Sequence, residues 1–236
     1  MKSFYNQNKL KAVTFSYDDG TTQDIRLVEL LNKYNLKCTF NINSDLLGKN
    51  GILTCQNQSV SHYKLCREDI KKVYEGHEVA VHTLTHPNLT ALKKEEIIEQ
   101  VEQDRINLED IVGYEVVGMA YPCGGINNDD RVAEIIKNYT KIKYCRTITN
   151  TDSFDIQDNL YRFNPNVHHL QWERMTELAE KFIDSTPDKP QIFYIWGHSF
   201  EMDCDSSYWL KLEDLFKLIS NRDDIFYGTN SEVLIK

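Results

Sequence analysis

Long apolar runs are absent from this sequence of 236 residues. A membrane-spanning helix needs about 20 consecutive apolar residues, and no run approaches that length. Residues 1–15 also lack the apolar core of roughly 7–15 residues that marks a secretory signal. We therefore expect a protein without a membrane span that resides in the cytoplasm.

Concentrated positive charge is absent too. The chain carries 27 Lys and Arg against 36 Asp and Glu, a formal net charge of −9 at pH 7, and its basic residues occur as scattered pairs such as Lys71-Lys72. Nucleic-acid binding requires a dense basic face. We expect no nucleic-acid partner, and we attribute the negative charge to solubility.

Glycine and proline are scarce, with ten and five residues, and the six cysteines form no CxxC pair. We find no linker, internal repeat or low-complexity tract, so the sequence predicts a single domain over residues 1–236. Cysteines without a metal-type pattern or a secretory signal are typical of reduced thiols. We expect reduced thiols at Cys38, Cys55, Cys66, Cys123, Cys145 and Cys204.

Short apolar runs alternate with amphipathic stretches along the chain. Runs rich in β-branched and aromatic residues predict seven strands, at residues 11–17, 38–42, 78–82, 116–121, 143–147, 191–196 and 225–228. Apolar residues at helical spacing predict six helices, at residues 21–31, 68–74, 93–112, 129–138, 174–184 and 209–221.

The order of these elements indicates the fold class. Strands that alternate with helices predict an α/β fold with a parallel sheet and helices outside it, and this number of units favours a closed or nearly closed β/α barrel. Thr21 is expected to cap the first helix. Residues 43–65 are expected to form a loop-like excursion from the barrel.

Three groups of polar residues directly follow predicted strands. Asp18 and Asp19 follow the first strand, His82 and His86 end the third, and His198 follows the sixth. Each group alone has an ordinary explanation, as a turn, a coincidence or a core histidine. In a β/α barrel, however, the carboxyl ends of the strands open onto one face, so together these residues predict a functional site.

The residue types at this face suit metal-dependent hydrolysis. Two imidazoles and one carboxylate bind a divalent ion and leave positions open for water. Zn²⁺ suits this set best, and Co²⁺, Mn²⁺, Ni²⁺ and Fe²⁺ accept similar sets. One of Asp18 and Asp19 is expected to bind the metal and the other to act as base, with His198 as acid.

These residues, in this order, resemble the motifs of the polysaccharide deacetylase family, which is carbohydrate esterase family 4 or the nodulation-protein-B homology domain. Residues 16–20 (SYDDG) resemble its motif T-F-D-D-G, residues 82–87 (HTLTHP) its motif H-[ST]-x-x-H with the following Pro, and residues 196–198 (WGH) its motif L-x-H. The resemblance extends over residues 11–235 and implies a distorted (β/α)7 barrel.

The resemblance also implies a role for each motif residue. Asp18 would be the general base and His198 the general acid, while Asp19, His82 and His86 would hold the metal ion. The reaction would be the removal of an acetyl group from an N-acetylated sugar by metal-activated water.

The third and fourth family motifs are changed in this sequence. The third motif, R-x-P-Y-G, is AYPCG here, which implies an oxyanion hole made by the backbone N–H of Cys123. Ala120 replaces the arginine that orients the base, and Arg146 is either its substitute or a surface residue. The fourth motif, Asp-Trp, has only Asp152 and Asp155 as stand-ins.

Aromatic residues near the motifs are candidates for contact with a sugar. Tyr121 and Trp209 could stack on a sugar ring, although aromatic residues in a core or at a rim need no ligand. Trp196 replaces the leucine expected beside the acetyl methyl group, which implies a different acyl pocket. His168 and His169 either line the cleft or are exposed to solvent.

We therefore expect a deacetylase that acts on an acetylated amino sugar or oligosaccharide. An amidase of the same superfamily acting on a small non-sugar amide is one alternative, and a catalytically silent carbohydrate-binding domain is another. Retention of the base, the ligands and the acid disfavours the silent domain, since binding alone does not need them.

Overall fold

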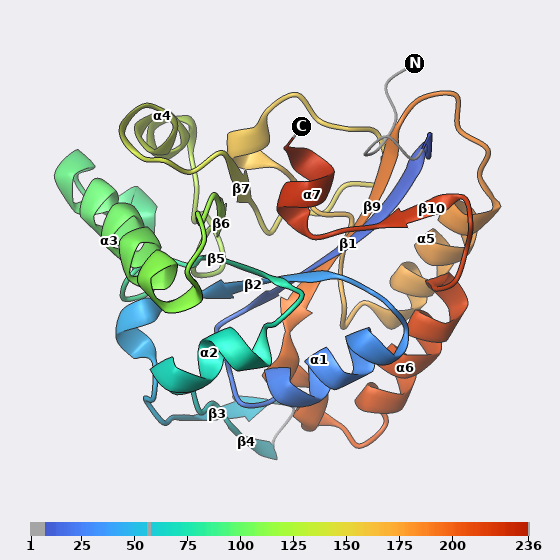
Figure 1. Ribbon diagram of the computed structural model, residues 1–236, viewed down its shortest axis with the longest axis horizontal. Helices are drawn as coiled ribbons and strands as arrows, with labels where there is room; N and C mark the ends of the chain where they lie inside the picture. The colour runs from blue at the N-terminus through green and yellow to red at the C-terminus, as the bar shows by residue number, and fades with distance from the viewer. Residues whose placement is uncertain (1–7, 56–57, 236) are drawn as a thin grey trace.

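The computed structural model describes residues 8–55 and 58–235, and a curved sheet of eight parallel strands forms its centre (Figure 1). The strand order is β7-β6-β5-β2-β1-β9-β8, and β10 pairs with β1 outside this path. The strands are β1 (Lys11–Asp18), β2 (Cys38–Ile42), β5 (Glu78–Val81), β6 (Gly118–Ala120), β7 (Tyr144–Arg146), β8 (Val167–His168), β9 (Gln191–His198) and β10 (Ile225–Tyr227).

The two ends of this sheet are joined to each other. A parallel β-bridge links Arg146 of β7 to Phe163, shortly before β8, and the Phe163 amide donates a hydrogen bond to the Cys145 carbonyl at 2.9 Å. The seven-strand path is thus the distorted (β/α)7 barrel that the family resemblance implied. All seven predicted strands are confirmed, and β8 is an addition.

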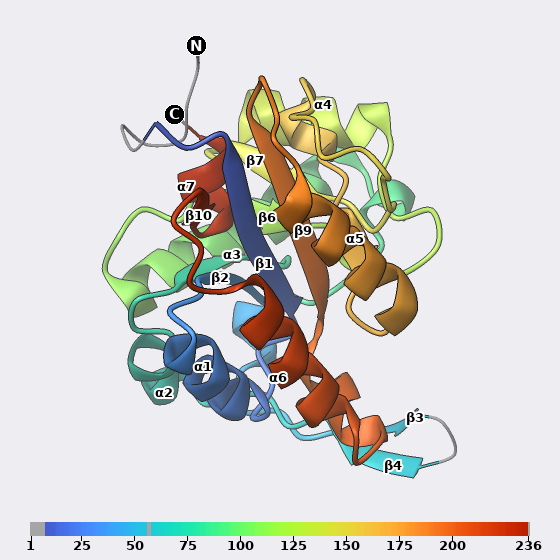
Figure 2. The same ribbon diagram turned by 90° about the vertical axis from the view of Figure 1, so that its right-hand side faces the viewer.

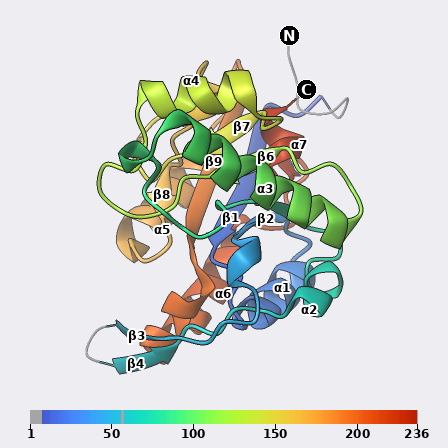
Figure 3. The same cartoon turned by 90° about the vertical axis from the view of Figure 1, so that its left-hand side faces the viewer.

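Helices cover the outside of the barrel (Figures 1 and 3). They are α1 (Asp24–Lys33), α2 (Arg67–Val73), α3 (Lys94–Val112), α4 (Asp130–Tyr139), α5 (Trp172–Asp184), α6 (Tyr208–Ile219) and α7 (Asn230–Leu234), with short 3-10 helices η1 (Ser44–Leu46), η2 (Leu89–Ala91), η3 (Leu160–Arg162) and η4 (Ser199–Cys204). The six predicted α-helices are confirmed. Among the described residues, no helix is long and apolar enough to span a bilayer.

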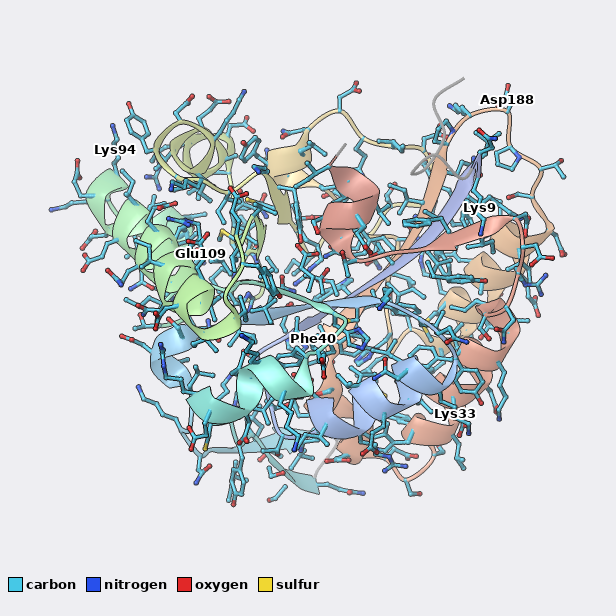
Figure 4. All side chains as sticks on the ribbon, viewed as in Figure 1. Lys9, Lys33, Phe40, Lys94, Glu109 and Asp188 are labelled. Atoms are coloured by element: carbon cyan, nitrogen blue, oxygen red, sulfur yellow. A yellow bond between two sulfur atoms is a disulfide. The ribbon has the colours of Figure 1, made fainter. Side chains whose placement is uncertain are left out.

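The core lies between the helices and the sheet. Phe40 of β2 is fully buried near the middle of the molecule and stacks on Tyr74, with ring centroids 4.3 Å apart. Lys33, Lys94 and Asp188 instead lie at the periphery and point outwards (Figure 4). Buried apolar strands therefore support the polar residues at their carboxyl ends.

The turn after β1 differs from the prediction, because Thr21 does not cap the first helix. Helix α1 starts after Gln23, and the Thr21 hydroxyl instead bonds to Ser199 Oγ at 3.0 Å. Asp24 is buried and accepts a hydrogen bond from the Tyr74 hydroxyl at 2.6 Å. These polar groups hold neighbouring loops together, and this tertiary role overrides the local capping pattern.

The excursion at residues 43–65 contains an antiparallel hairpin of β3 (Ile52–Cys55) and β4 (Gln58–Ser61). The hairpin projects from the body of the molecule (Figure 2). A disulfide joins Cys55 to Cys204 in η4, so the prediction of reduced cysteines is wrong for this pair, whereas the other four cysteines are free. The two partners are 149 positions apart, and no local pattern in the sequence signals such a pairing.

Thiol counting tests this disulfide. In protein purified and unfolded without reductant, we expect four of the six cysteines to react with an alkylating reagent, as read by intact mass. Cys55→Ser should lower the free energy of unfolding in urea by on the order of 2–5 kcal/mol. Cys66→Ser, which removes an exposed free thiol, is the control. Six reactive thiols in the unreduced protein would contradict the pairing.

Candidate active site

The carboxyl ends of β1, β5 and β9 bring the predicted site residues together. Asp18 lies opposite His198 in the pairing of β1 with β9, and the Asp19 amide donates to the Asn41 carbonyl of β2 at 2.9 Å. A cavity of about 210 Å³ lies between these strand ends, and its lining consists of Asp18, Asp19, His82, His86, Tyr121, Cys123, Gly124, Ile148, Trp196 and His198.

Asp19, His82 and His86 form a group that can hold a metal ion. Their ligand atoms lie within 4.8 Å of one another, and the two imidazole rings have centroids 4.9 Å apart. His82 Nδ1 donates to the Ala120 carbonyl at 2.9 Å, which leaves the lone pair of Nε2 for a metal. This donor set fits a divalent ion such as zinc.

The three candidate ligands are in the protonation states that metal binding requires. Burial lowers the pKa of His82 to about 4 and also lowers the pKa of His86, so both imidazoles are neutral at pH 7. Burial alone would raise the pKa of Asp19, but the hydrogen bond from His62 and the charge of Lys64 hold it well below its usual value. The group therefore offers two neutral imidazoles and an ionised carboxylate.

Four residues in or beside this cavity have left-handed backbone conformations. The φ angles are 84° at Asp19, 67° at Thr83, 64° at His86 and 69° at Cys123. For residues with a Cβ atom, such conformations cost roughly 1–3 kcal/mol each. Elsewhere in the described chain, positive φ among non-glycine residues is confined to asparagines, which tolerate it. Backbone strain is thus concentrated at the site, as is typical of functional positions.

Asp18 is held by Arg146, the residue proposed to substitute for the missing family arginine. The two side chains form an ion pair and both are buried. Arg146 reaches Asp18 from β7, where it is the register partner of Ala120 on β6. Burial alone would raise the pKa of Asp18, but the charge and hydrogen bond of Arg146 keep it below its usual value. Asp18 is therefore ionised at neutral pH, as a general base must be.

His198 is held by Glu201, a site residue that the sequence did not identify. Glu201 Oε2 accepts hydrogen bonds from His198 Nδ1 and from the His198 backbone amide, both at 3.1 Å. Burial alone would lower the pKa of His198, but the hydrogen bond and charge of Glu201 raise it to about 9. His198 is therefore protonated at pH 7, with Nε2 4.0 Å from Asp18 Oδ2. The only local signal is the three-residue spacing typical of a capping box.

His168 and His169 bind the same carboxylate. His169 Nε2 donates to Glu201 Oε2 at 2.7 Å, while its Nδ1 accepts from the Tyr17 hydroxyl at 3.0 Å. His168 Nε2 lies 3.2 Å from the same oxygen. His169 is fully buried, so the alternative of solvent exposure is wrong for it. Gly197 is required here, because a Cβ atom at this position would lie 2.4 Å from the His169 ring.

Tyr121, Trp196 and Cys123 line the cavity, in agreement with their predicted positions. Trp196 packs on Arg146, whose guanidinium carbon is 4.5 Å from the indole centroid. Cys123 Sγ lies 3.8 Å from His86 Nδ1, and burial raises the pKa of its thiol. The thiol is thus protonated at neutral pH, which is consistent with water as the nucleophile.

Three other candidates lie outside the cavity. Asp152 and Asp155 are paired with basic side chains away from the cavity, so neither replaces the carboxylate of the fourth motif. Trp209 is buried on the inner face of α6 and packs against Arg26, whose guanidinium carbon is 4.3 Å from the ring. Helix packing thus places Trp209 in the core, in agreement with the alternative that it needs no ligand.

Two further residues contact Asp19, a candidate metal ligand, and were also missed. His62 and Lys64 follow strand β4 and lie 3.1 Å and 2.9 Å from the two Asp19 carboxylate oxygens. Both are more than 40 positions from Asp19 in the chain, and the excursion that carries them has no family motif. Sequence spacing offered no signal for this contact.

Sequence comparisons relate the chain to deacetylases. The family model for polysaccharide deacetylase matches residues 5–141. A peptidoglycan-N-acetylglucosamine deacetylase of Listeria monocytogenes is 28% identical over 128 residues, which are 53% of this chain and 24% of that protein. A peptidoglycan-N-acetylmuramic acid deacetylase of Bacillus subtilis is 31% identical over 125 residues, which are 51% and 23% of the two chains. The matched segments thus span about a quarter of these relatives.

Solved structures share the fold over nearly the whole chain. The chitin deacetylase of Colletotrichum lindemuthianum aligns with a TM-score of 0.60 and 21% identity, covering 97% of this chain and 88% of that one. A pseudoenzyme of carbohydrate esterase family 4 from Bacillus anthracis aligns with a TM-score of 0.58 and 19% identity, covering 97% and 66%. Together with the family-model match, the motifs and the barrel establish that this chain belongs to the polysaccharide deacetylase family.

Proposed function

We propose that this protein is a metal-dependent hydrolase that removes acetyl groups from N-acetylated sugars. One observation carries the proposal: a divalent-metal ligand set, an ionised Asp18 and a protonated His198 meet in one cavity. The Listeria and Bacillus relatives are named as peptidoglycan deacetylases, which supports an acetylated amino sugar as substrate.

The residues divide the reaction between them. A divalent ion held by Asp19, His82 and His86, with zinc as the best fit and cobalt, manganese, nickel or iron as alternatives, would polarise the acetyl carbonyl and lower the pKa of water. Asp18 takes the proton of the attacking water, and His198 donates a proton to the amide nitrogen as the C–N bond breaks. The products are acetate and the free amine.

The remaining site residues stabilise this arrangement. Arg146 keeps Asp18 ionised and oriented, while Glu201 keeps His198 protonated. Cys123 lies at the cavity with a left-handed backbone, and we assign its N–H to the developing oxyanion. Trp196 replaces a smaller aliphatic residue and shapes the space for the acetyl methyl group.

A second cavity, of about 530 Å³, supports a sugar over a small non-sugar amide. Neighbouring residues of the chain line the two cavities: Gly124 and Ile148 line the first, and Gly125 and Thr149, the next residues, line the second. Amide side chains both donate and accept hydrogen bonds, which suits sugar hydroxyls. The amides that line this cavity are Asn128, Gln157, Asn159 and Asn164.

A catalytically silent carbohydrate-binding domain is the alternative from another class, and one structural neighbour is a pseudoenzyme. Sugar binding alone needs neither a buried ionised base nor a protonated acid. Both groups are present here with all three ligands, which favours an enzyme.

The cytoplasmic location stays a prediction. A disulfide such as Cys55–Cys204 is more typical of an oxidising compartment than of the cytoplasm. Cell fractionation with an antibody to the protein decides between the two locations.

Two substitutions distinguish the proposed general base, Asp18, from a proposed metal ligand, His82. Asp18→Asn should lower acetate release from N-acetylglucosamine oligomers by at least about 100-fold while zinc content stays near wild type. His82→Ala should lose the zinc itself, as measured by metal analysis after dialysis. Asp152→Asn, a substitution outside the cavity, is the control. Full activity and unchanged zinc content in both variants would contradict the assigned roles.

The pH profile tests the partnership of Glu201 and His198. Glu201 raises the pKa of His198 to about 9, so the acid stays protonated until the pH rises through that value. In Glu201→Gln the loss of charge should lower this pKa, and the basic limb of kcat/KM should move to lower pH by roughly one to three units. Glu99→Gln, on the exposed face of α3, is the control. A basic limb that does not move would show that Glu201 does not support the acid.

A further inference from the structure

The segment after β4 places two side chains on one metal ligand. Lys64 Nζ lies 2.9 Å from Asp19 Oδ1 and also donates to the Asp19 backbone carbonyl at 2.7 Å. His62 Nε2 lies 3.1 Å from the other oxygen, Oδ2. Both oxygens of the carboxylate therefore already have a partner from outside the ligand group.

Backbone pairing fixes this segment beside Asp19. The Thr22 amide donates to the Tyr63 carbonyl at 2.8 Å, and the Leu65 amide donates to the Gly20 carbonyl at 2.9 Å. An antiparallel bridge also pairs Thr21 with Lys64. These backbone contacts thus hold Lys64 beside Asp19, and the side chain of Lys64 is only 6% exposed.

The two partners of Asp19 differ in their position relative to the metal ligands. Oδ1, which Lys64 holds, is 3.9 Å from His86 Nε2 and therefore faces this candidate ligand. A divalent ion held by this oxygen would lie close to the ammonium group, which would repel it strongly in a site of low dielectric. His62 bonds to the other oxygen, Oδ2, so it does not compete with a metal ion for Oδ1.

We propose that metal binding at this site is an exchange of cations on Asp19. The incoming ion displaces the Lys64 ammonium from Oδ1, while His62 continues to donate to Oδ2 and orients the carboxylate. Lys64 compensates the buried charge of Asp19 in the metal-free protein and so lowers the affinity for metal, whereas His62 raises it. The inference rests on the metal site of the proposed function and adds two positioning residues to it.

Zinc affinity, measured by competition with a chromophoric chelator, tests the exchange. Lys64→Met keeps the length of the side chain without its charge and should bind Zn²⁺ tighter, by roughly tenfold or more. His62→Phe should bind it roughly 10–100-fold more weakly, and His62→Gln, whose amide can still donate to Oδ2, should recover most of that loss. Lys71→Met, on the exposed face of α2, should bind like wild type.

The exchange predicts that zinc binds tighter in Lys64→Met and more weakly in His62→Phe. If both residues had only a structural role, zinc binding would weaken in both variants. Zinc affinity in Lys64→Met equal to or below that of wild type would overturn the exchange. Lys64→Arg retains the charge and guards against a folding defect of the methionine variant: it should bind zinc no tighter than wild type, and tighter binding would also overturn the exchange. A wild-type protein that binds no zinc would instead overturn the proposed metal site.

Discussion

Two neighbouring carboxylates are buried and ionised at the end of β1, and the rest of the site is arranged around their charge. An ionised carboxylate buried without a partner costs several kcal/mol. Arg146 from β7 compensates Asp18, and Lys64 from the segment after β4 compensates Asp19. Arg146 also forms the bridge that joins the two ends of the sheet. Closure of the barrel and charge compensation of Asp18 therefore depend on the same strand.

The surroundings of the two carboxylates fit the roles that the family resemblance implied, which the residue types alone had left open. Asp19 shares a ligand group with His82 and His86, whereas Asp18 lies opposite His198. Burial keeps the imidazoles of His82 and His86 neutral, while Glu201 keeps His198 charged. Histidines that line one small cavity thus differ in charge, because burial dominates at His82 and His86 whereas Glu201 stabilises the protonated form of His198.

The sequence predicted the strands, the helices and the motif residues, because each of these depends on residues close together in the chain. Buried strands rich in apolar residues revealed the barrel, and strand ends with Asp and His revealed the site. Arg146 could be proposed because parallel strands end at the same face, and it is the register partner of Ala120. Glu201, His62, Lys64 and the Cys55–Cys204 disulfide escaped prediction because their contacts arise from tertiary placement of the hairpin and η4. Two alternatives stayed open for Trp209 because nothing local in the sequence distinguishes a core aromatic residue from one that binds a sugar.

The central claim is that the cavity at the end of β1 hydrolyses an acetamide with the help of a divalent ion. The most direct measurement is acetate release from N-acetylglucosamine oligomers by the wild-type protein, first after treatment with a chelator and then after addition of Zn²⁺ or Co²⁺. Release that disappears with the chelator and returns with the metal is the predicted result. Zinc bound at the site without release of acetate from any acetylated sugar would contradict the account and favour a silent binding domain.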